Sequence, residues 1–293
     1  MSYHSMQEIL TACEEQNKNF YEVIIEDDRK ERGVSKEESY EKMRNLWEAM
    51  LSASMNYDSS LKSASGLVGG DGGKMKEYQE KGEGYGDTFL LEVVVRALQM
   101  GESNACMKRI VAAPTAGSCG VLPAVLVPLY QEKKVTEEKI IEALYVAAGI
   151  GQVIATRAFI AGAAGGCQAE IGSASSMAAG ALVYLKGGSP NQIAQGAAIA
   201  LKGLLGLACD PVAGLVEVPC VKRNVLGAVN ALTSADMALA GIESAIPVDQ
   251  VIDAMREIGE KMDVSLKETG EGGLAATERG EEMKRMLSKE KCN

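Results

Sequence analysis

The chain has 293 residues, of which 46% are hydrophobic, enough to bury the core of one large domain or of two. Its formal net charge is −10, so a nucleic-acid-binding surface, which needs clustered Lys and Arg, is not expected. The start, MSYHSMQEIL, has no apolar signal segment and the seven cysteines lack paired spacing, which favours a reducing cytoplasm.

No membrane span is expected. The longest uncharged run covers residues 110–131 and contains Pro114, Pro123 and Pro128. A bilayer-spanning helix of about 20 apolar residues would not normally carry these prolines.

The first 57 residues are predicted to form two helices. A capping-box pattern at 5–8 predicts a first helix reaching Asp28, and the same pattern at 35–38 precedes a second. The second helix carries an apolar stripe that we interpret as core packing, namely Met43, Leu46, Trp47, Met50 and Leu51. Residues 1–57 are therefore predicted to be a helical extension to a larger domain spanning 58–293.

Residues 58–86 contain SASGLVGGDGG and KGEGYG, and this glycine content predicts a long loop instead of a helix. Glycines at Gly66, Gly69 and Gly70 would let backbone amides surround an anion. A plain flexible linker is the alternative interpretation.

Asp87 or Thr88 is predicted to cap a helix running through Met100 and closed by Gly101. The stretch APTAGSCG follows, with consecutive amides and hydroxyls from 115 to 120 ahead of a short apolar helix. Free N–H groups at a helix start can seat a carboxylate, although such a turn can equally be purely structural.

Further helices are predicted from Thr136 to Ile160, from Ser189 to about 207, from Asn224 to about 242, and from Pro247 onward. No period-2 strand pattern is found, so the predicted fold class is all-α. Residues 143–245 hold only 10 charged residues and should form the buried centre of the fold. Charges there should be paired or functional, which singles out Glu170, Asp210, Glu217, Lys222 and Arg223, together with the polar Asn224.

Three cysteines in this centre, Cys167, Cys209 and Cys220, each sit beside Gly, Pro or a charged residue. Their separations of 42 and 11 positions do not fit the C-x2-C pairs of zinc ribbons or ferredoxin-type clusters. Glycines beside Cys167 would let the backbone come close to a bulky bound group, and prolines near Cys209 and Cys220 would fix the chain beside those two thiols. Free cysteine is also a common small core residue, so the residues alone leave both interpretations open.

At the level of longer blocks, the sequence resembles the alpha chain of the iron-sulfur-dependent L-serine dehydratases. The blocks that carry this resemblance are SGLVGGDGGKM (65–75), AAPTAGSCGVLPAVL (112–126), GAAGGCQAEIGSASSMAAGAL (162–182), CDPVAGLVEVPCVKRN (209–224) and the Cys-Asn end.

This resemblance implies conversion of L-serine to pyruvate and ammonia with a [4Fe-4S] cluster on Cys167, Cys209 and Cys220, and with Cys292 as a candidate fourth ligand. It implies a separate beta chain as partner. It also assigns substrate binding to two segments, with the candidate residues Ser63, Ser65, Gly66, Gly69, Gly70, Lys74, Thr115, Ala116, Gly117 and Ser118. We interpret Cys119 as a thiol that lines the pocket and not as a ligand of the cluster.

Other functions stay open. A cluster-dependent L-cysteine desulfidase and a non-enzymatic iron-sulfur sensor would use the same cysteines. A pyridoxal-phosphate dehydratase is disfavoured because none of the central lysines stands in a recognisable cofactor motif. The sequence assigns no catalytic base, and the single histidine, His4, lies in the terminal segment.

Overall fold

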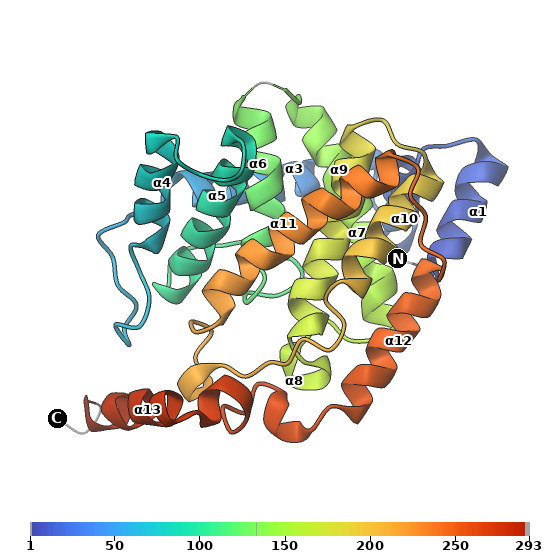
Figure 1. Cartoon of the computed structure of the whole chain (residues 1–293). Coiled ribbons are helices and arrows are strands. Elements are labelled where there is room, and N and C mark those ends of the chain that lie inside the picture. Colours follow the sequence, from blue (N-terminus) through green and yellow to red (C-terminus); the bar gives the residue numbers. More distant parts are fainter. Residues whose placement is uncertain (1, 133, 291–293) are drawn as a thin grey trace.

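The computed structural model describes residues 2–132 and 134–290, and every regular element within those ranges is a helix. The predicted all-α fold is confirmed. Figure 1 shows the arrangement of the α-helices, which are α1 (Met6–Gln16), α2 (Phe20–Arg32), α3 (Lys36–Met55), α4 (Asp71–Lys81), α5 (Thr88–Ala105), α6 (Val121–Gln131), α7 (Glu137–Arg157), α8 (Gly162–Gly165), α9 (Ser173–Leu185), α10 (Pro190–Lys202), α11 (Cys220–Leu239), α12 (Val248–Lys261) and α13 (Glu278–Glu290). Short turns complete them: η1 (Gln168–Gly172), η2 (Val212–Gly214), η3 (Val264–Leu266) and η4 (Gly273–Ala276).

Helix α9 is the centre of the packing, with every residue from Ser173 to Val183 buried. It packs against α6, α7, α10 and α11. Its small side chains allow neighbouring helices to approach closely: a Cβ on Gly180 would lie 2.2 Å from Ile150 Cδ1 of α7. The charge-poor region is thus the buried centre, as predicted.

The N-terminal helices pack into the same core. Phe20 and Ile24 of α2 lie against Gly149 of α7, where a Cβ would come within 2.7 Å of Ile24 Cδ1. Trp47 of α3 is fully buried and meets Tyr130 of α6 edge to face, with ring centroids 5.5 Å apart.

The single helix predicted from residue 6 to Asp28 is wrong, because the chain forms α1 and α2 there. Asn17 adopts a left-handed conformation (φ 50°) that ends α1. Asn19 then begins α2 with a capping box to Glu22.

Four of the predicted helix starts are well placed. The side chains of Asp87, Thr136 and Ser189 each accept a hydrogen bond from the backbone N–H three residues on, and Ser35 forms a full capping box with Glu38. The box predicted at Ser5 is half formed, because the Glu8 carboxylate accepts from the His4 N–H instead.

Several predicted boundaries need correction. Residues 58–86 are not all loop, since α4 forms within them. Helix α5 continues through Gly101 to Ala105, because Gly101 is where α11 passes, with Val221 Cα 3.1 Å from the position of a Cβ. Leu46 is 42% exposed and lies outside the core stripe.

The remaining corrections concern two helix ends and one helix start. Helix α7 ends at Arg157 and α10 at Lys202, each several residues earlier than predicted. Helix α11 starts at Cys220, so Asn224 lies inside its first turns and not before it.

In the described ranges, α7 is the one helix long and apolar enough to cross a bilayer. In its most apolar window, 67% of the residues are buried inside the protein. Its apolar character is explained by packing against α9 and α2.

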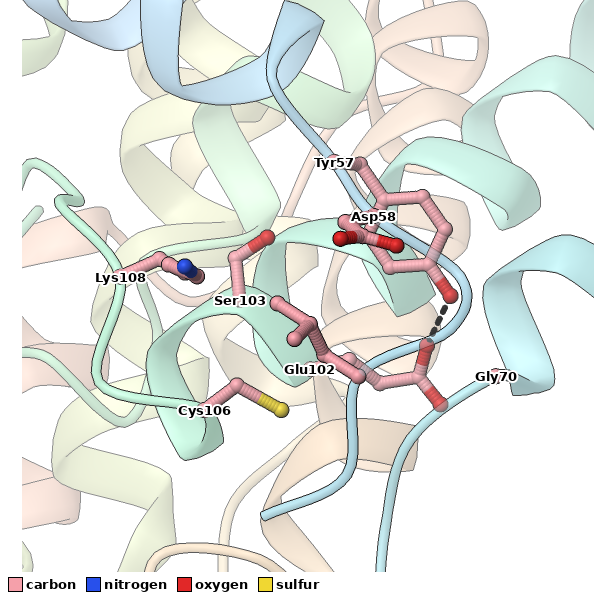
Figure 2. Close-up of a pocket in the computed structure, with 8 residues that line it drawn as sticks. Tyr57, Asp58, Gly70, Glu102, Ser103, Cys106 and Lys108 are labelled. Carbon is pink, nitrogen blue, oxygen red and sulfur yellow. Dashed lines mark hydrogen bonds between the residues drawn. The ribbon is translucent and has the colours of Figure 1, made fainter.

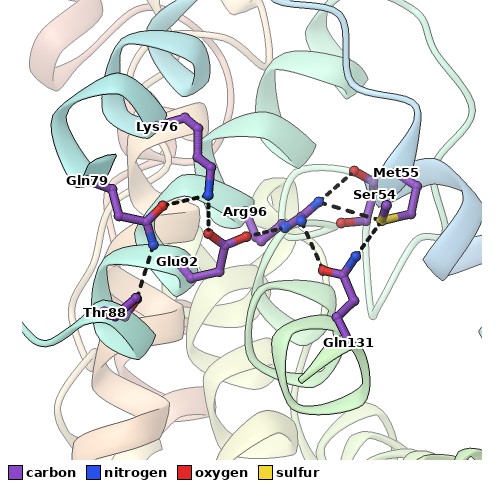
Figure 3. A network of polar contacts seen from close by, with 8 residues as sticks. All are labelled: Ser54, Met55, Lys76, Gln79, Thr88, Glu92, Arg96 and Gln131. Atoms are coloured by element: carbon purple, nitrogen blue, oxygen red, sulfur yellow. Dashed lines mark hydrogen bonds and ion pairs between the residues drawn. The ribbon is translucent and has the colours of Figure 1, made fainter. Parts of the chain in front are cut away.

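A polar network fixes α4 onto its neighbours (Figure 3). Lys76 of α4 pairs with Glu92 of α5 at 3.0 Å, and Glu92 also accepts from Arg96 at 2.8 Å. Arg96 continues to Gln131 of α6 at 2.9 Å and to the Ser54 carbonyl of α3 at 3.2 Å. This network joins the four helices α3, α4, α5 and α6.

Candidate functional site

Three separate elements bring the predicted ligand cysteines together. Cys167 lies between α8 and η1, Cys209 lies in the segment after α10, and Cys220 is the first residue of α11. Their exposed fractions are 2%, 2% and 6%. Cys167 and Cys209 lie close enough for each to shift the pKa of the other, and the charge of Cys167 also raises the pKa of Cys220.

The backbone around Cys167 is shaped for close approach. Gly166 has φ 79°, and a Cβ there would lie 2.6 Å from Met262 Sδ and 2.9 Å from the Leu207 carbonyl. Gln168, fully buried, binds the Leu207 carbonyl through its backbone N–H and the Gly206 N–H through its side-chain oxygen. Gln168 thereby joins the Cys167 segment to the segment that leads to Cys209.

Cys209 is held from its other side by the chain that follows α12. Its N–H donates to the Leu266 carbonyl at 2.8 Å, and its carbonyl accepts from Glu268 at 2.7 Å. Glu268 has φ 63°, unusual for a residue other than glycine.

The three thiols differ in acidity. The neighbouring Cys209 thiol lowers the pKa of Cys167, and the nearby Arg223 guanidinium lowers it further. The pKa of Cys209 is raised because it keeps its proton beside Cys167, and burial raises the pKa of Cys220 to about 12. Cys167 is therefore the thiol that ionises first.

Glu170, from the short π-helical turn η1, links the cysteines to the Thr115 turn. Thr115 Oγ1 donates to Glu170 Oε1 at 2.6 Å, and Cys209 Sγ lies 3.9 Å from Glu170 Oε2. The carboxyl group is 9% exposed, and burial raises its pKa. Room is tight: a Cβ on Gly162 would lie 2.8 Å from both Cys209 Sγ and Glu170 Oε2.

The turn containing Thr115, Ala116, Gly117 and Ser118 is fixed by Asn224. The side-chain NH2 group of Asn224 donates to the Gly117 carbonyl at 2.8 Å, and its side-chain oxygen accepts from the Gly120 N–H at 2.8 Å. The backbone N–H of Thr115 is bound by Ser118 Oγ, and that of Cys119 by the Ala116 carbonyl. Several backbone N–H groups of this turn, which were predicted to be free to bind a carboxylate, are therefore hydrogen-bonded within the protein.

The remaining thiol of this turn, Cys119, is 1% exposed and points to the Met100 carbonyl of α5, with its sulfur 3.8 Å away. Burial raises its pKa to about 12.

The Gly-rich segment reaches the same region through Glu217, three residues before Cys220. Ser63 donates to Glu217 Oε2 at 2.8 Å, and Ser65 donates to the same oxygen. Gly66, Gly69 and Gly70 all have positive φ, and a Cβ on Gly69 would lie 2.3 Å from the Leu61 carbonyl. Lys74, by contrast, is a 75% exposed side chain on α4 that pairs with Asp71 at 3.0 Å.

Asp210 and Arg223 form a buried ion pair beside the cysteines. Arg223 Nη2 lies 2.8 Å from Asp210 Oδ1, and Nη1 donates to the Ala208 carbonyl at 2.7 Å. The second oxygen of Asp210 accepts from the Leu274 N–H at 2.8 Å. Asp210 thus ties the segment after α12 to the site.

Sulfur donors of this kind suit iron-sulfur clusters, and Arg223 beside Cys167 offsets the negative charge that thiolates would bring. Within residues 2–132 and 134–290, no three Cys, His, Asp or Glu side chains already stand in metal-coordinating geometry. Cys292 lies outside the described residues. The donor set therefore fits the predicted group in chemistry and burial.

Gln168 and Glu268 contribute to the site and were missed by the sequence interpretation. Gln168 sits among small residues in GGCQAE, just before Glu170, where a long polar side chain was an available signal. Glu268 lies in a Gly-rich segment, and its approach to Cys209 is purely tertiary.

Comparisons with known proteins agree on one family. Residues 15–275 match the family model described as serine dehydratase alpha chain. The chain is 45% identical over 285 residues to the probable L-serine dehydratase alpha chain of Bacillus subtilis, covering 97% of this chain and 95% of that one. It is 41% identical over 288 residues to the L-serine dehydratase alpha chain of Peptoniphilus asaccharolyticus, covering 98% and 99%. L-serine dehydratase 2 of Escherichia coli is 46% identical over 183 residues, which are 61% of this chain but 40% of that longer protein.

Proposed function

The chain belongs to the serine dehydratase alpha-chain family, and on this premise we propose that it is the alpha chain of an L-serine dehydratase. The enzyme converts L-serine to pyruvate and ammonia. A [4Fe-4S] cluster is held by Cys167, Cys209 and Cys220. The observation that carries this proposal is the gathering of three buried thiols from three elements beside Glu170 and Arg223.

When bound, the cluster supplies a Lewis-acidic iron that stabilises the departing 3-hydroxyl group. The chain itself provides a site shielded from water, because the three sulfurs and Glu170 are nearly fully buried. Arg223 keeps a positive charge beside the thiolates. Loss of water from serine leaves aminoacrylate, which tautomerises and takes up water to give pyruvate and ammonia.

Substrate binding is assigned to the two segments that meet the site through carboxylates. Thr115 reaches Glu170, and Ser63 and Ser65 reach Glu217. The hydroxyls and the backbone of these segments are suited to hydrogen-bond the amino and carboxylate groups of an amino acid. The exposed, Asp71-paired Lys74 is assigned a weaker role than the serines.

A beta chain is proposed as the partner, and residues 58–293 as the catalytic unit. The alpha-chain names of the two relatives covered over nearly their whole length support a second chain. The six cysteines in the described ranges are all free thiols, which supports a cytoplasmic location.

The testing experiment is anaerobic reconstitution of the chain with iron and sulfide, followed by pyruvate assays with and without the beta chain. We expect bound iron and sulfide, no pyridoxal phosphate, little turnover alone, and release of pyruvate from L-serine with the beta chain present. Full turnover by the isolated chain would contradict the partner proposal. Faster sulfide release from L-cysteine would indicate a desulfidase, and iron binding without turnover in any combination would indicate a sensor.

Gly162→Ala tests the packing around the cluster ligands. The added methyl group would press on Cys209 and Glu170, so we expect a cost of about 1–3 kcal/mol in unfolding free energy and a lower iron content after reconstitution. Ala163→Ser, at the exposed neighbouring position, is the control and should change neither quantity. Normal iron content in Gly162→Ala would show that the sulfur moves freely away from this position.

A further inference from the structure

Glu102, near the end of α5, is a buried carboxylate with no role in the site described so far. Its exposed fraction is 1%. The Tyr57 hydroxyl donates to it at 2.6 Å, the Asp71 N–H at 2.7 Å and the Gly72 N–H at 3.1 Å. Figure 2 shows Tyr57 and Gly70 converging on this side chain from two different stretches of chain.

The three donors lie on both sides of residues 58–70, the part of the Gly-rich loop that is meant here by the Gly-rich segment. Tyr57 immediately precedes residues 58–70, and Asp71 and Gly72 immediately follow them. One carboxylate therefore pins the two ends of the segment that carries Ser63 and Ser65. Within the segment, Ser63 N–H bonds the Val68 carbonyl at 3.0 Å, which keeps the loop folded on itself.

The Glu102 carboxylate also caps the N-terminus of α4, where the residue before the helix provides no capping side chain. Gly70 precedes α4 and offers no side chain to the orphan N–H groups of the first turn. An anion at a helix N-terminus is favoured by both those N–H groups and the helix dipole. Gly72 allows the approach, since a Cβ there would lie 2.7 Å from Gln99 Cγ and 3.1 Å from the Tyr57 hydroxyl oxygen.

The chemistry of the site requires a carboxylate. All three partners are donors, and a carboxylate accepts from all of them without offering a hydrogen of its own. Glutamine at this position would keep one acceptor oxygen and turn an NH2 group toward a donor. The loss falls on the loop ends, because the rest of α4 is held separately by the Lys76 contact with Glu92 (Figure 3).

We propose that Glu102 is a positioning residue for substrate binding, which sets the Gly-rich segment so that Ser63 and Ser65 meet Glu217 beside Cys220. The part of its test that measures KM and kcat for L-serine rests on the proposed function. Glu102 does not touch the cysteines or the Thr115 turn in any contact described above, so its effect passes through the loop.

The experiment compares wild type, Glu102→Gln, Tyr57→Phe and Glu92→Gln in the reconstituted complex with the beta chain. For Glu102→Gln we expect KM for L-serine to rise about tenfold or more while kcat changes less than about threefold, with unchanged iron content. Tyr57→Phe removes one donor of three and should shift KM in the same direction by less. Glu92→Gln, which loosens α4 away from the loop ends, should leave KM near the wild-type value.

A second readout does not need turnover. Hydrogen exchange of the amides at 63–72 should speed up in Glu102→Gln and, more weakly, in Tyr57→Phe, while Glu92→Gln leaves them protected. If wild type makes no pyruvate, the proposed function fails and this exchange pattern alone decides whether Glu102 anchors the loop. Unchanged exchange and KM in a folded Glu102→Gln would overturn the proposal. If Glu102→Gln does not fold, unchanged exchange and KM in Tyr57→Phe would overturn it.

Discussion

Replacing Cys209 with alanine is expected to abolish iron binding and serine dehydration while leaving the helical fold intact. Cys209 lies next to Cys167, and its thiol is 3.9 Å from Glu170 Oε2, so its sulfur belongs to the proposed ligand set. Its structural bonds to the segment after α12 are made by the backbone and survive the change. Cys167→Ala and Cys220→Ala should behave alike.

The measurement is iron and sulfide per chain after anaerobic reconstitution, together with pyruvate formation in the presence of the beta chain. Cys13→Ala is the matched control, because Cys13 is equally buried but lies in the N-terminal core. Cys106→Ala is a second control, at a half-buried thiol. Wild-type iron content in Cys209→Ala would remove this residue from the ligand set.

Asp210→Ala is expected to lower the unfolding free energy by about 3–5 kcal/mol, which is the usual cost of leaving one member of a buried ion pair without its partner. Arg223, with 14% of its side chain exposed, would lose the carboxylate, and the Leu274 N–H would lose its acceptor. Denaturant unfolding of the chain without added iron measures the effect separately from cluster loss.

Two comparisons isolate the buried pair. Asp210→Asn keeps an acceptor for Leu274 and should lose less stability than Asp210→Ala. Glu257→Ala breaks an exposed pair with Lys261 and should have little effect. Equal stability of Asp210→Ala and wild type would mean that Arg223 finds a new partner or reaches solvent.

Helix starts marked by a capping side chain were predictable because this signal is local. Ser35, Asp87, Thr136 and Ser189 each place an oxygen over the N–H groups of the turn that follows, whatever the rest of the chain does. Helix ends were less predictable. Gly101 looks like a terminator in sequence, yet its lack of a side chain serves the crossing of α5 and α11.

Prediction of the site depended on which residues carry a signal of their own. The cysteines stood out by their settings and by family resemblance, and Glu170 by the scarcity of charge around it. Glu102 gave no signal, because in the stretch LQMGESNACMK it reads as an ordinary polar residue near a helix end. Its burial comes from α4 and Tyr57 folding over it, which is a tertiary event.

The pairing of Cys209 with residues 266–268 fixes when the site can be completed during synthesis. Glu268 lies about a hundred residues after Cys167, and at roughly 5–20 residues per second this interval takes about 5–20 s of translation. During that time Cys167 has already been synthesised, but residues 266–268, whose backbone holds Cys209, have not. We therefore expect the proposed cluster site to be completed only after residues 266–268 have been made, and a chain truncated before residue 266 would carry all three proposed ligands without the backbone that holds Cys209.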